Sequence, residues 1–151
     1  MEMSYIGEIA MRLGAATLVA AGVGLDRELR HKPAGLKTHA LVGLGSALIV
    51  VVAAALSNMT HPDTAAMSRV IQGLIAGVGF LGGGAILKSS SDEMVTGLTT
   101  AASIWLVASL GVACGAGQWA VALIGFGIAL LVLVGGNAAE KFVIRSQGQN
   151  D

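Results

Sequence analysis

The sequence predicts an all-α membrane protein with about five transmembrane helices. The chain of 151 residues is 54% hydrophobic and only 12% charged, whereas soluble domains carry roughly 25% charged residues. Five apolar stretches follow one another, each near the roughly 20 residues that a membrane helix needs. Five helices this apolar would leave a short chain without polar surface, which argues against a soluble bundle.

Each predicted helix is an apolar run between polar connections. The runs are 6–25, 39–56, 70–87, 98–114 and 118–135. Arg12 interrupts the first run and no basic leader precedes it, which argues against a cleaved signal peptide. The polar connections are 26–37, 57–69 and 88–97, and a tight CGAG hairpin at 114–117 joins the last two runs. We expect a membrane domain over 1–137 and a short, fraying tail over 138–151.

Lysine and arginine placement predicts the orientation. With five segments, seven cations fall on one side: Arg27, Arg30, Lys32, Lys37, Lys88, Lys141 and Arg145. The other side has Arg12 and Arg69. We therefore expect a multi-pass protein of the bacterial inner membrane, with the N-terminus outside and the C-terminus in the cytoplasm.

The third apolar run is rich in glycine. GVGFLG at 77–82 fits the G-x-G-x-x-G pattern of dinucleotide-binding turns, but no strand–turn–helix context surrounds it. Close helix packing through small residues is the preferred interpretation, since Gly73 and Gly77 lie four residues apart. Similar faces are offered by Ala16, Ala20 and Gly24 in the first run and by Gly111 and Gly115 at the end of the fourth. The adjacent glycines Gly82, Gly83 and Gly84 leave an alternative open, a broken helix that exposes backbone groups to a ligand.

Two short similarities suggest an internal repeat. LVAAGVGL at 18–25 resembles LIAGVGFL at 74–81, and GLKTHALV at 35–42 resembles GLTTAASI at 97–104. They predict a parallel repeat of helices one and two with helices three and four. Thr38 and Thr100, with Thr99, would then cap helix N-termini. The alternative is an anion site at these positive helix ends.

The DRE stretch at 26–28 holds the acidic residues of most interest. Asp26 and Glu28 are the candidate metal ligands, because Mg²⁺ prefers oxygen and needs few carboxylates. A salt-bridged interfacial cluster with Arg27 and Arg30 is at least as plausible. The middles of runs two to five have no carboxylate or lysine, which argues against a proton-coupled pump.

Other functional classes find little support. The net charge is zero, so no basic field suggests nucleic acid. The single cysteine, Cys114, permits no intrachain disulfide or Cys-rich metal site. His39, at a helix start, is interpreted as interfacial. No catalytic arrangement of side chains stands out, so no enzyme is predicted.

Three longer segments together resemble the MgtC/SapB family of bacterial inner-membrane proteins. They are GVGLDRELRHKPAGLKTHALVGLGSAL at 22–48, SRVIQGLIAGVGFLGGGAIL at 68–87 and GLTTAASIWLVASLGVACGAG at 97–117. The resemblance implies a helical membrane protein with a cytoplasmic C-terminus, connected with growth at low magnesium and, in some members, with survival in phagocytes. It also implies that some members regulate the membrane ATP synthase. Longer members carry a soluble domain after the last helix, and this sequence ends about fifteen residues past that helix. The functions that depend on that domain, including a virulence role, are therefore not implied for this sequence by the resemblance.

The motifs and the resemblance together give the binding or interaction candidates. These are Asp26, Arg27, Glu28, Arg30, Thr38, Arg69, Gly79, Gly82, Gly83, Gly84, Thr99 and Thr100. We expect a self-associating, non-enzymatic modulator linked to magnesium or ion homeostasis, without a resident cofactor unless Mg²⁺ binds. The alternative is a transporter or channel for Mg²⁺ or another small ion.

Overall fold

Five antiparallel helices form the protein, as the sequence predicted. The computed structural model describes residues 2–58, 64–88 and 95–147. The helices are α1 (Glu2–Leu29), α2 (Leu36–Asn58), α3 (Thr64–Ala85), α4 (Leu98–Gly115) and α5 (Trp119–Gln147). All five are long and apolar enough to cross a membrane, so the all-α membrane fold is confirmed.

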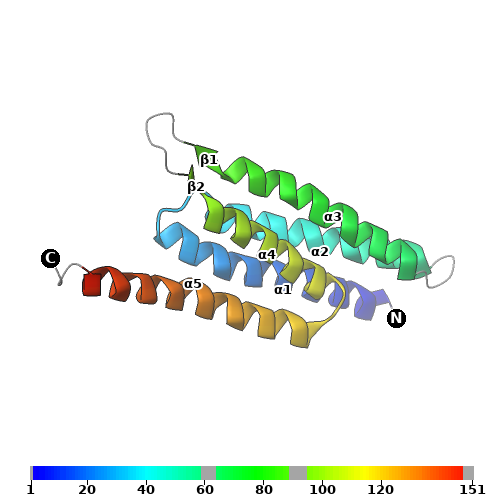
Figure 1. Cartoon of the computed structure of the whole chain (residues 1–151). Coiled ribbons are helices and arrows are strands. Elements are labelled where there is room, and N and C mark those ends of the chain that lie inside the picture. The colour runs from blue at the N-terminus through cyan, green and yellow to red at the C-terminus, as the bar shows by residue number, and fades with distance from the viewer. Residues whose placement is uncertain (1, 59–63, 89–94, 148–151) are drawn as a thin grey trace.

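Helix α4 lies at the centre of the bundle and contacts each of the other four helices (Figure 1). Helices α1 and α2 form one hairpin, α3 and α4 form another, and the two hairpins meet along α2 and α4. The predicted parallel repeat of the two hairpins stays a prediction. Helix α5 lies on the opposite side of the bundle from α3 (Figure 1).

The connections are short where the backbone turns sharply. Gly117, with a φ of +71°, follows α4, and the Gly117 amide donates to the Cys114 carbonyl at 2.9 Å. Glycine enters this left-handed region without steric penalty, so the tight CGAG turn is confirmed. The third connection begins and ends in a two-residue antiparallel ribbon, β1 (Leu87–Lys88) and β2 (Val95–Thr96), which the sequence did not predict.

Helix α5 is longer than predicted. Its apolar span is Trp119–Gly136, close to the predicted run, but the helix continues to Gln147. The helix therefore extends into the predicted tail as far as Gln147, and the fraying of that tail stays a prediction. The residues beyond, 148–151, lie outside the described part of the chain.

Close packing of small residues joins α1, α2 and α4. Ala16, Ala20 and Ala47 are each at most 1% exposed. A Cβ added at Gly115 would lie 2.7 Å from the Ala47 carbonyl oxygen, so the backbones of α2 and α4 are in contact there. The predicted small-residue packing of the first and fourth helices is confirmed.

The α3 glycines behave differently. The helix is continuous through Gly82, Gly83 and Gly84 and ends at Ala85, so the broken helix that the sequence left open as an alternative is absent. Of the six glycines on α3, only Gly82 would bring an added Cβ within 4 Å of a described neighbour, Ala101. The packing prediction for the other α3 glycines is therefore wrong for contacts within this chain.

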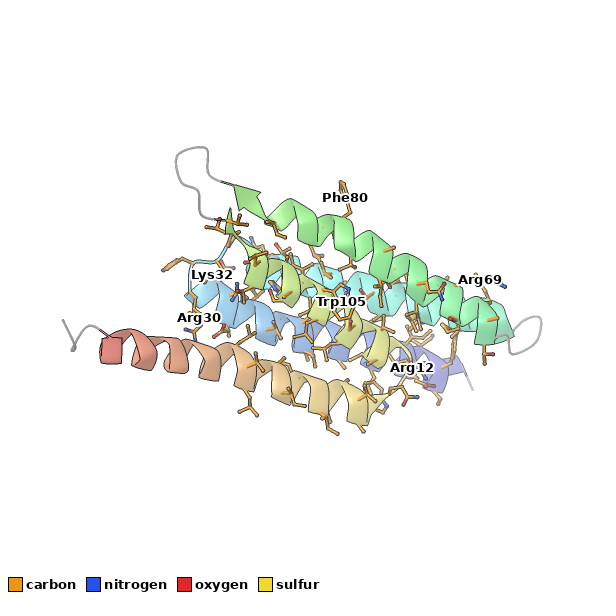
Figure 2. All side chains as sticks on the ribbon, viewed as in Figure 1. Arg12, Arg30, Lys32, Arg69, Phe80 and Trp105 are labelled. Atoms are coloured by element: carbon orange, nitrogen blue, oxygen red, sulfur yellow. The ribbon has the colours of Figure 1, made fainter. Side chains whose placement is uncertain are left out.

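The charged residues separate to the two ends of the bundle (Figure 2). Arg30 and Lys32 lie at the end with the first connection, and Arg12 and Arg69 lie at the other end. The first connection, the β ribbon and the end of α5 share one end (Figure 1), so the predicted grouping of cations is confirmed. Arg12 pairs with Glu8 and donates to the Gly115 carbonyl at 2.9 Å.

Candidate functional site

A buried polar cluster lies inside the bundle near the end that holds the first connection. Its members are Arg27 on α1, His39 on α2, and Thr100 and Ser103 on α4, each at most 3% exposed. Polar side chains inside a membrane helix bundle are costly unless they are partnered, and they often mark function. We call these four residues the polar cluster.

Arg27 joins α1 to the first turn of α4. Its Nη2 donates to the Thr100 hydroxyl oxygen at 3.0 Å, across 73 residues of sequence. Its Nε has no hydrogen-bond partner among the described residues. The guanidinium carries a fixed positive charge, so the bundle interior here is electropositive.

His39 joins α2 to α4 in the same cluster. Its Nδ1 lies 2.8 Å from the Gly35 carbonyl oxygen, which only accepts, so Nδ1 carries the proton. Its Nε2 lies 3.0 Å from the Ser103 hydroxyl, whose oxygen is also 2.8 Å from the Thr100 carbonyl. In the neutral ring Nε2 accepts, so the single Ser103 proton has two acceptors, and the cluster forms one connected network.

The backbone of α1 makes room for His39. A Cβ added at Gly24 would lie 2.9 Å from the His39 Cβ and 2.8 Å from the Leu36 Cα. Glycine at this position therefore lets the start of α2 approach α1 closely enough for the His39 ring to reach Ser103. The interpretation of His39 as an interfacial side chain is wrong, because the residue is fully buried.

The two predicted metal ligands reach different partners. Asp26 Oδ1 accepts from Arg30 Nε at 2.8 Å, while Asp26 Oδ2 is buried without a partner among the described residues. Glu28 Oε2 accepts from the Leu36 backbone amide at 3.0 Å. Residues two apart on a helix point in nearly opposite directions, and the described residues contain no group of three or more His, Cys, Asp or Glu side chains that could hold a metal. The magnesium site stays a prediction.

Glu28 is expected to stabilise the start of α2, because its carboxylate satisfies an amide that the helix leaves unpaired. Glu28→Ala should lower the free energy of unfolding by about 0.5–1 kcal/mol, the lower part of the range for capping interactions. Thermal unfolding in detergent measures this effect. Lys32→Ala, at an exposed position of the same connection, is the control. An equal effect of both substitutions would contradict the capping role.

The structure brings together only some of the predicted candidates. Arg27 and Thr100 meet directly, and Asp26 pairs with Arg30. The capping prediction for Thr100 is wrong, because Gly97 precedes α4 without a side-chain cap and the Thr100 hydroxyl accepts from Arg27. Thr38 and Thr99 are exposed in the first turns of α2 and α4.

The remaining candidates lie on α3 and are not members of the polar cluster. Arg69, Gly79, Gly83 and Gly84 are exposed, and Gly82 packs on α4. The sequence interpretation missed His39 and Ser103 as members of the cluster. Their spacing held the relevant information, because Ser103 is three residues after Thr100 and His39 is four after Gly35, so each pair shares a helix face.

Comparison with known proteins gives consistent similarities. Residues 13–142 match the description "MgtC family". Protein SrpB of Synechococcus elongatus is 46% identical over 134 residues, which are 84% of this chain and 74% of SrpB. Putative magnesium transporter YhiD of Escherichia coli is 37% identical over 129 residues, 83% of this chain and 59% of YhiD.

A third relative shows the same pattern. Protein SapB of Bacillus subtilis is 41% identical over 113 residues, which are 73% of this chain but 48% of SapB. The chain thus spans most of SrpB and about half of SapB. No solved structure matches the chain.

Proposed function

Because the chain belongs to the MgtC family, we propose that it is a non-enzymatic inner-membrane protein that modulates other membrane proteins in magnesium homeostasis. The family match confirms the resemblance predicted from the three motifs. A link to magnesium is supported by the relatives, one of which is named a putative magnesium transporter. The choice between modulator and transporter rests on the polar cluster.

The buried Arg27 guanidinium is the observation that favours a modulator. It lies within the polar cluster, and it donates a hydrogen bond to Thr100 in the first turn of α4. A fixed positive charge inside the bundle repels a divalent cation, and this repulsion is stronger where water is excluded. The hydrogen bond to Thr100 also gives the arginine a structural task. The polar cluster therefore favours a helix clamp over a cation pathway.

One observation favours the transporter alternative. The buried Asp26 Oδ2 has no partner in the described part of the chain, and an unpaired carboxylate oxygen is a suitable Mg²⁺ ligand. Arg27 and Arg30 lie beside it in sequence and oppose a cation there. Transport would therefore require Asp26 to leave Arg30, and Asp26→Asn would abolish flux.

Ion flux distinguishes the two functions. The purified full chain in liposomes is expected to give no Mg²⁺, K⁺ or proton flux above that of empty vesicles. Fluorescent indicators inside the vesicles measure each ion, and protease accessibility of the termini checks insertion. Saturable Mg²⁺ flux that Asp26→Asn abolishes would overturn the modulator proposal and establish the alternative.

The partner follows from the family resemblance rather than from a contact in the structure. We propose the membrane ATP synthase as the first partner to test, through ATP-driven proton uptake in inverted vesicles with and without the chain. We also propose self-association, with Gly79 and Gly83 of α3, four residues apart and both facing open space, as a surface for close helix contact. The cationic end of the bundle is proposed to face the cytoplasm, by the positive-inside rule.

A further inference from the structure

Three adjoining apolar hollows, of about 600, 590 and 360 Å³, lie along α2 and α3. The first two share Ile49 and Val70, and the second and third share Val42 and Leu81, so the hollows are continuous. We call the middle hollow, which Arg69, Gly73, Gly77 and Leu81 line on α3, the α2–α3 groove.

Glycines, which have no side chain, leave this groove open. A Cβ added at Gly45 on α2, or at Gly73 or Gly77 on α3, would meet no described atom within 4 Å. Each glycine in a helix costs roughly 1 kcal/mol relative to alanine, and packing within this chain does not offset that cost at these three positions. The groove is thus open to an external ligand, and its volume lies within the roughly 300–1,000 Å³ typical of ligand sites.

A cation stands at one end of the groove. Arg69 lines it and is exposed, and its side chain forms no hydrogen bond or ion pair with the described residues. Figure 2 shows Arg69 near the end of α3 that lies on the same side as Arg12. Twelve residues separate Arg69 from Leu81, about 18 Å at 1.5 Å per residue. That distance is close to half of the roughly 30 Å hydrocarbon core, the depth of one leaflet.

We propose that the α2–α3 groove binds one anionic phospholipid, with its phosphate on Arg69 and an acyl chain against Gly73 and Gly77. The guanidinium is suited to bidentate recognition of phosphate. The apolar walls suit an acyl chain, and the groove depth suits a single leaflet. Charge complementarity thus selects a lipid with its headgroup at the Arg69 end.

A second copy of the chain fits this end of the groove less well. A helix in the groove would need a negative group to meet Arg69. Glu8, an acidic side chain described at this end of the bundle, is already paired with Arg12. A lipid phosphate supplies the missing charge without disturbing that pair, whereas an apolar helix face would leave Arg69 desolvated and unpaired.

Native mass spectrometry of the full chain with added phosphatidylglycerol tests the proposal. We expect one bound lipid and weaker binding of an uncharged diacylglycerol. Arg69→Gln should weaken phosphatidylglycerol binding about ten-fold, the change expected for loss of one charge-assisted hydrogen bond. Gly77→Leu should fill the groove and reduce binding of both lipids.

Two substitutions serve as matched controls. Gly79→Leu adds the same side chain to α3 at an open glycine that does not line the three hollows, and Lys37→Gln removes an exposed cation at the other end of the bundle. Both should bind phosphatidylglycerol like the unchanged chain. Equal binding of the two lipids, or no effect of Arg69→Gln, would overturn the proposal. The proposal would also be overturned by a dimer without bound lipid that Gly77→Leu removes and the control substitutions leave intact.

Discussion

Gly111→Ala is expected to destabilise the fold by a net of about 1–2 kcal/mol, although alanine is the better helix former. An added Cβ at Gly111 would overlap the Gly43 carbonyl oxygen on α2 and lie 2.9 Å from the Ser46 Cβ. A backbone carbonyl cannot move aside unless all of α2 moves. Overpacking of this kind costs about 1–3 kcal/mol or more, which outweighs the roughly 1 kcal/mol gained in helix propensity.

Gly45→Ala provides the matched control for this prediction. Gly45 lies on α2 but faces open space, so the same substitution should leave stability unchanged or raise it by up to about 1 kcal/mol. The single cysteine, Cys114, is buried, so a thiol-reactive dye reports thermal unfolding in detergent without a further label. Equal unfolding temperatures for the two variants would show that α2 and α4 do not pack through Gly111.

Two pairs of glycines with the same spacing, on α3 and on α4, differ in what they contact. Spacing of four residues correctly indicated a small face on α4, which Gly111 and Gly115 provide. The same spacing at Gly73 and Gly77 gave the same prediction, yet a Cβ added at either would meet no described atom within 4 Å. The sequence contains the stripe, but contact depends on which helices become neighbours, and that is a property of the whole bundle.

The helices themselves were predictable because apolar length alone identifies a membrane span. The extension of α5 to Gln147 was not, because hydropathy marks the boundary of the membrane and not the end of backbone hydrogen bonding. A helix can continue into water when its residues favour it. The predicted end at 135 is close to the end of the apolar span at Gly136.

The polar cluster was only half visible in the sequence. Arg27 and Thr100 were both candidates, but no local pattern joins residues 73 positions apart. His39 was assigned to the interface because it begins an apolar run. Its burial depends on Gly24, which lets α2 approach α1, and on Ser103, which meets the ring from α4. These are tertiary conditions that one sequence does not reveal.

Thr100→Val is expected to destabilise the protein by about 1–3 kcal/mol, whereas Arg27→Met should be close to neutral. Valine keeps the shape of threonine but leaves the buried guanidinium without the hydroxyl acceptor, and loss of one partner costs the desolvation of the other. Methionine removes the charge together with its need for a partner, and such apolar replacements are often neutral or stabilising. The unfolding temperature, measured with the Cys114 dye, reports both.

The double variant isolates the interaction between the two residues. On the Arg27→Met background, Thr100→Val should cost less than it does alone, with a coupling of about 1–2 kcal/mol, within the range for residues in direct contact. Ser109→Ala is the control, since its hydroxyl bonds only to the Trp105 carbonyl of its own helix among the described contacts, and it should show no coupling to Arg27. Additive effects of Arg27→Met and Thr100→Val would mean that the buried arginine does not clamp α1 to α4. The fixed charge would then have no structural task, and only its repulsion of cations would still favour a modulator over a transporter.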